Sequence, residues 1–73
     1  MKGSEFLRKI KKLGKENGIK VELREERGKG SHCTLIFGER FTIIRNLKDE
    51  LMTGTYNAML KQLGINKKEL GDV

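Results

Sequence analysis

Residues 32–45 read HCTLIFGERFTIIR, and this stretch decides the fold. Two strand-like runs, 32–37 and 40–45, flank the pair Gly38-Glu39. A two-residue connection that begins with glycine is typical of a type II′ β-hairpin. Alternation then divides the side chains into two sets: Cys33, Leu35 and Phe37 with Arg40, Thr42 and Ile44, and His32, Thr34 and Ile36 with Phe41 and Ile43. Both sets carry apolar residues, so the pattern alone leaves the buried face open. We expect the Leu35 set to face the core and His32 to lie on the open face.

The residues before this hairpin predict one helix and one further strand. Ile19, Val21 and Leu23 alternate with charged residues, as in a half-buried strand. Residues 4–15 precede that strand, and their apolar positions recur at helical spacing. Ser4 is a candidate N-cap of this helix, and either Gly14 or Gly18 is a candidate for its end.

The residues after the hairpin predict a second helix. Thr53 or Thr55 is a candidate N-cap, Gly64 is a candidate stop, and the apolar stripe between them is Tyr56, Met59, Leu60 and Leu63. Asn66 and Glu69 resemble a capping box for a short last turn. Residues 1–73 are therefore expected to form a single two-layer α+β domain. Its order is α-β-β-β-α, with a three-stranded antiparallel sheet covered on one face by the helices and a short extra C-terminal helix.

The composition favours a nucleic-acid partner. The chain has 16 basic and 10 acidic residues and a net charge of +6, and such a surface attracts phosphate backbones. Only Phe6, Phe37, Phe41 and Tyr56 are aromatic, so gripping of the backbone is expected more than base stacking. One cysteine, no membrane-length apolar run and no signal-peptide pattern predict a cytoplasmic protein with no membrane partner.

His32 is the only histidine in the chain and the main candidate for chemistry. An imidazole can move protons near neutral pH, and the cations of Arg27 and Lys29 can hold phosphate oxygens nearby. The alternative interpretation is a tight turn with ordinary solvated charges. Ser31 is adjacent in the chain and would point to the opposite face, so a Ser–His nucleophile pair is not expected. Cys33 with His32 makes a poor zinc site, and we predict no metal and no cofactor.

The chain carries Gly30-Ser31-His32, a hairpin, Lys48-Asp49-Glu50-Leu51, Gly54-Thr55, and Met59-Leu60-Lys61-Gln62-Leu63-Gly64-Ile65. These motifs resemble the HicA toxin family, and the resemblance covers nearly the whole chain. The resemblance implies a double-stranded-RNA-binding-domain-like fold and a toxin of a type II toxin–antitoxin system. It implies ribosome-independent cleavage of mRNA, with the family's histidine at His32. The partners would be mRNA and a HicB-like antitoxin, with operator DNA bound only indirectly through the antitoxin.

The sequence departs from the family pattern at positions that bear on mechanism. Cys33 stands where many relatives have a second histidine, and Ile44-Arg45-Asn46 stands where many have a proline and a histidine. One histidine must therefore act without a histidine partner, either activating the 2′-hydroxyl or protonating the leaving oxygen. The expected RNA-binding residues are Arg27, Lys29, Gly30, Ser31, Arg40 and Arg45, and Asp49 and Glu50 are expected to be solvated charges. Two other functions compete with this one: a non-catalytic RNA-binding module of the same fold, and a protein-interaction domain whose charge is incidental.

Overall fold

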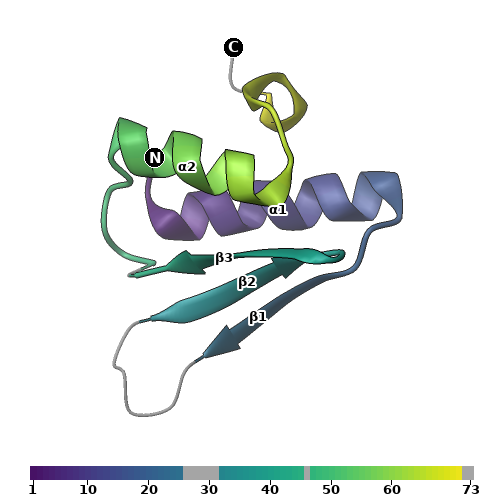
Figure 1. Ribbon diagram of the computed structural model, residues 1–73, viewed down its shortest axis with the longest axis horizontal. Coiled ribbons are helices and arrows are strands. Elements are labelled where there is room, and N and C mark those ends of the chain that lie inside the picture. The colour runs from purple at the N-terminus through teal and green to yellow at the C-terminus, as the bar shows by residue number, and fades with distance from the viewer. Residues whose placement is uncertain (26–31, 46, 72–73) are drawn as a thin grey trace.

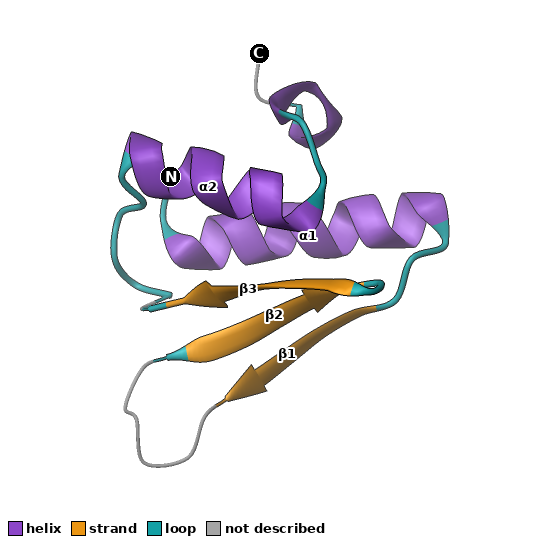
Figure 2. Cartoon of the chain, in the orientation of Figure 1, coloured by secondary structure: helices purple, strands orange, loops and turns teal. Residues whose placement is uncertain are grey.

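The computed structural model describes residues 1–25, 32–45 and 47–71, and its elements follow the predicted α-β-β-β-α order. Helix α1 spans Gly3–Asn17, and strands β1 (Val21–Glu25), β2 (Cys33–Phe37) and β3 (Arg40–Ile44) form one antiparallel sheet in that spatial order. Helix α2 spans Thr53–Leu63, and the 3₁₀ helix η1 spans Lys67–Leu70. Both α-helices lie on the same side of the sheet (Figures 1 and 2). The molecule is thus a two-layer α+β fold, and no helix among the described residues covers the other face of the sheet.

The hairpin of β2 and β3 has the predicted register. Phe37 pairs with Arg40, Leu35 with Thr42, and Cys33 with Ile44. Gly38 has a φ of 64°, which an L side chain rarely adopts, and its N–H donates to the carbonyl of Lys20 at 2.9 Å. This glycine therefore closes the turn and joins it to the chain that enters β1.

The core lies between the helices and the predicted face of the sheet. Leu35 is fully buried, Cys33 and Phe37 are nearly so, and the burial of β2 alternates along the strand. The predicted stripes of both helices are buried as well: Phe6, Leu7, Ile10 and Leu13 in α1, and Tyr56, Met59, Leu60 and Leu63 in α2. Thr42 is the buried polar side chain of β3, and its hydroxyl bonds to the Gln62 side chain of α2. This bond ties the second helix to the edge strand β3.

The predicted helix caps were wrong by one or more residues, and for α1 the structure shows the physical reason. Lys2 occupies the N-cap position of α1 and makes no side-chain cap, so Ser4 lies inside the helix. The N–H groups of Gly3 and Ser4 instead donate to the carbonyls of Asp49 and Leu47, at 3.0 and 2.8 Å. A segment distant in sequence thus satisfies the donors that a side chain would otherwise have to satisfy.

Helix α2 likewise begins without a side-chain cap. Met52 is its N-cap residue, so neither Thr53 nor Thr55 caps it. The helix stops were predicted more closely, since Gly18 and Gly64 end α1 and α2 in the left-handed conformation. The predicted cap of the last turn is also present, because the Asn66 side chain accepts a hydrogen bond from the Glu69 N–H at 3.1 Å.

Candidate functional site

His32 is exposed and directly precedes β2, which begins at Cys33 and not at His32 as predicted. The residue therefore stands at one end of the sheet, opposite the Gly38 turn. Four of the predicted RNA-binding residues, Arg27, Lys29, Gly30 and Ser31, lie outside the described residues.

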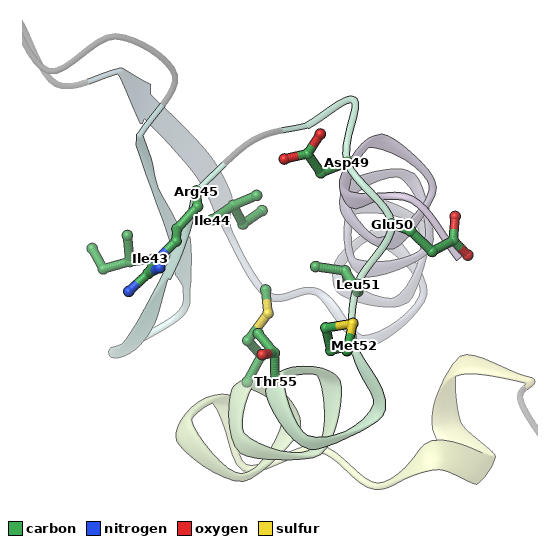
Figure 3. A pocket seen from close by; sticks show the side chains of 9 residues that line it. Ile43, Ile44, Arg45, Asp49, Glu50, Leu51, Met52 and Thr55 are labelled. Carbon is green, nitrogen blue, oxygen red and sulfur yellow. The ribbon is translucent and has the colours of Figure 1, made fainter.

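Arg45 is the predicted RNA-binding residue that the fold brings to the same end of the sheet as His32. Strand β3 ends at Ile44, which pairs with Cys33, so Arg45 directly after β3 and His32 directly before β2 lie at the same end of the sheet. Arg45 is exposed. Figure 3 shows its side chain on the same side of the chain as Ile43, while Ile44 points the other way. A proton carrier and a guanidinium thus share one end of the open face.

Arg40 lies apart from this pair. It pairs with Phe37 at the turn end of the hairpin, four residues from Ile44, or roughly 13 Å along the strand. Its side chain also lies on the helix side, because the Nε atom is 3.1 Å from the point where a Cβ on Gly64 would stand. The structure therefore does not join Arg40 to His32, and Arg40 is not placed to act at the same phosphate.

The open face carries a mixed row of charged and apolar side chains. Glu22 of β1 lies between Lys20 and Arg24, with contacts of 3.1 and 3.3 Å to their nitrogen atoms. The hydrogen bond from Lys20 and the positive charges of Lys20 and Arg24 lower the pKa of the Glu22 carboxyl below its ordinary value of 4.5. The two cations thereby offset the charge of Glu22, and β1 also carries a second acidic residue, Glu25.

Two large apolar side chains stand exposed on β3, and the sequence argument gave them no role. Phe41 is 60% exposed and Ile43 is 44% exposed. The predicted register did place them on the face of His32, so the signal was present in the alternation. It was missed as a binding feature because apolar residues on both faces made the buried side ambiguous.

An open pocket of about 410 Å³ adjoins Arg45 on the side where β3 leads toward α2 (Figure 3). Its walls include Ile44, Leu51 and Met59, and Asp49 and Glu50 lie along its rim. Glu50 is bonded by the amino group of Met1 at 2.8 Å, and this hydrogen bond lowers the pKa of the Glu50 carboxyl. Glu50 therefore has an ion-pair partner within the fold. Its exposure agrees with the prediction that it is a surface charge and not a catalytic group.

Within residues 1–25, 32–45 and 47–71, no three histidine, cysteine or acidic side chains gather where they could hold a metal ion. Cys33 is buried and forms no disulfide. In the same part of the chain no helix has the length and apolar character needed to cross a bilayer. No protein-family model matches the chain, and no match was found to a curated protein or to a solved structure.

Proposed function

We propose that this chain is a HicA-like toxin, a cytoplasmic endoribonuclease that cleaves mRNA independently of the ribosome and arrests growth. The observation that carries the proposal is the exposed His32 directly before β2, at the end of the sheet where the exposed Arg45 directly follows β3. The spacing from the Gly30-Ser31-His32 motif to the Lys61-Gln62-Leu63-Gly64 helix end supports the same assignment.

The chemistry follows from the groups at that end of the sheet. His32 takes the proton of an RNA 2′-hydroxyl, the 2′-oxygen bonds to the adjacent phosphorus, and the bond from phosphorus to the 5′-oxygen breaks. The leaving oxygen receives a proton from water or from the imidazolium, so the products are a 2′,3′-cyclic phosphate and a 5′-hydroxyl. The Arg45 guanidinium stabilises the charge of the phosphorane, together with Arg27 and Lys29, which precede His32 in the sequence. Arg40 has no part in this step because of its position.

A protein partner fits the same face. A HicB-like antitoxin would inhibit the enzyme by covering His32 and Arg45, and its covering surface would be acidic. Charge complementarity of this kind raises the association rate at low salt. Binding of operator DNA would then belong to the complex with the antitoxin and not to this chain alone.

Growth in bacteria tests the proposal. The native chain, His32→Ala and the control Asn57→Ala are expressed from a tight inducible promoter, and growth and mRNA integrity are followed. Asn57 is an exposed residue of α2, on the helix layer. We expect growth arrest with mRNA decay from the native chain and from Asn57→Ala, and neither effect from folded His32→Ala. If His32→Ala is as toxic as the native chain, or if all three are harmless at matched levels, the non-catalytic RNA-binding module replaces the enzyme.

A further inference from the structure

We propose that Phe41 is a stacking platform for an unpaired base, so that single-stranded RNA crosses the open face of the sheet on its way to His32. The inference deepens the proposed function and rests on it for the link to cleavage. Phe41 differs from every other aromatic residue of the chain in its surroundings. Phe6, Phe37 and Tyr56 are buried in the core, whereas Phe41 is 60% exposed.

The register fixes where this ring lies relative to the candidate catalytic end. Phe41 pairs with Ile36, which pairs with Glu22, so it stands in a row across the open face. Two residues further along β3, Ile43 extends the same face, and Arg45 follows it (Figure 3). Phe41 and Arg45 are four residues apart, or roughly 13 Å along an extended strand. A base on Phe41 would therefore sit near the cleaved phosphate but not on it.

The charges around the ring favour a polyanion as the occupant. Lys20 and Arg24 of the β1 side are largely exposed, and Arg45 is exposed at the far end of β3. The acidic side chain in the row, Glu22, is paired with both Lys20 and Arg24. The ring of Phe41 can stack a base while the cations of β1 and Arg45, at other points of the same face, hold neighbouring phosphates.

The strand form of the RNA follows from the same geometry. Bases in a duplex are stacked on each other and offer no free ring face to a protein side chain. A single strand can stack one base on Phe41 while its backbone phosphates contact Lys20, Arg24 and Arg45. The substrate class is thus single-stranded RNA with little sequence preference at the stacked base, because every base has a ring face.

Fluorescence of one introduced tryptophan tests the proposal directly. The natural chain has no tryptophan, so Phe41→Trp in a His32→Ala background gives a single reporter in a full chain that cannot cut its ligand. We expect quenching on addition of a short oligouridylate and none with the duplex that it forms with oligoadenylate. Absence of quenching by the single strand, or equal quenching by the duplex, overturns the proposal.

Affinity measurements in the same background separate stacking from apolar contact. Phe41→Leu keeps an apolar side chain without a ring face, and Phe41→Tyr keeps the ring. Loss of one stacked base corresponds to about 5- to 150-fold weaker binding. We expect Phe41→Leu to weaken oligouridylate binding by a factor in this range and Phe41→Tyr to bind within about twofold of the native residue. If Phe41→Leu binds RNA as tightly as the native residue does, the proposal is refuted. If that variant then fails to bind a protein partner, the face is a protein interface.

The two proposals fail in distinguishable ways. Binding is measured without His32, so it does not depend on catalysis. If RNA quenches the introduced tryptophan but the native chain does not cleave RNA, the ribonuclease proposal is wrong and the stacking proposal stands. If the native chain cleaves RNA and Phe41→Leu cleaves it with the same rate and KM, the ribonuclease proposal stands and the stacking proposal is wrong.

Discussion

Replacing Gly14 by alanine tests the contact between the first helix and the sheet. Gly14 is buried within α1, four residues before the Gly18 stop. Alanine in a helix interior is ordinarily more stable than glycine by about 1 kcal/mol, so helix propensity alone predicts stabilisation. The structure predicts the opposite. A Cβ on Gly14 would overlap the Val21 Cγ2 atom and would lie 2.8 Å from the Ile19 carbonyl oxygen.

The size of the effect follows from which atoms must move. The Val21 methyl can be relieved only by a change of rotamer or position, and the Ile19 carbonyl belongs to the backbone that leads into β1. Overpacking of this kind costs about 1–3 kcal/mol, and the gain in helix propensity offsets about 1 kcal/mol of that cost, so we expect a net loss of up to about 2 kcal/mol. For a domain of this size each kcal/mol shifts the melting temperature by about 4–8 °C, so Gly14→Ala should melt up to roughly 15 °C below the native chain.

Gly54→Ala is the matched control for this prediction. Gly54 lies in the first turn of α2, and no atom lies within 4 Å of a Cβ built there. We expect that variant to melt at the native temperature or a few degrees above it, with a gain of up to about 1 kcal/mol. Thermal unfolding followed by circular dichroism measures all three chains in one buffer. A Gly14→Ala chain that melts at or above the native temperature would refute the close approach of α1 and β1.

Two further predictions concern the charges of the open face. Arg45→Ala should lower the slope of log affinity for oligouridylate against log salt by about 0.7, the contribution of one phosphate contact on a single strand. Lys12→Ala, on the exposed surface of α1 in the helix layer, should leave that slope unchanged, and equal changes in both variants would argue against an RNA path over the sheet. The lowered pKa of Glu22 gives a stability contribution that is present above the ordinary pKa of 4.5 and is lost as the pH falls through the lower value in the folded chain. Glu22→Gln should therefore be less stable than the native chain in denaturant titrations near neutral pH and should converge with it in acid; a difference that widens in acid would contradict the assigned ion pairs.

The sequence was sufficient for the order of the elements and for the hairpin register. Side chains in a strand alternate with a period of two, and a two-residue turn at Gly38-Glu39 permits only one alignment of the flanking strands. The pairing of Leu35 with Thr42 follows from these two constraints. The apolar stripes of the helices were predictable for the same local reason, since helical spacing is written directly in the positions of Phe6 and Ile10.

The remaining features depend on contacts between segments that are distant in sequence. The start of α1 is satisfied by carbonyls of Leu47 and Asp49, and no local pattern indicates this. The predicted hairpin already set Arg40 on the other face from His32 and at the turn end, and its grouping with the RNA-binding residues followed residue type and not this register. The exposure of Phe41 agrees with the expected open face, but the alternation alone did not decide which face the helices cover.

Analysis of the RNA ends left by the purified chain tests the central claim most directly. A labelled single-stranded RNA is incubated with the native chain and with His32→Ala. A chelator is present to inactivate contaminating nucleases that need a metal ion. The account predicts fragments with 2′,3′-cyclic phosphate and 5′-hydroxyl ends from the native chain and intact RNA from His32→Ala. Fragments with 5′-phosphate ends, or the same cleavage by His32→Ala, would contradict it.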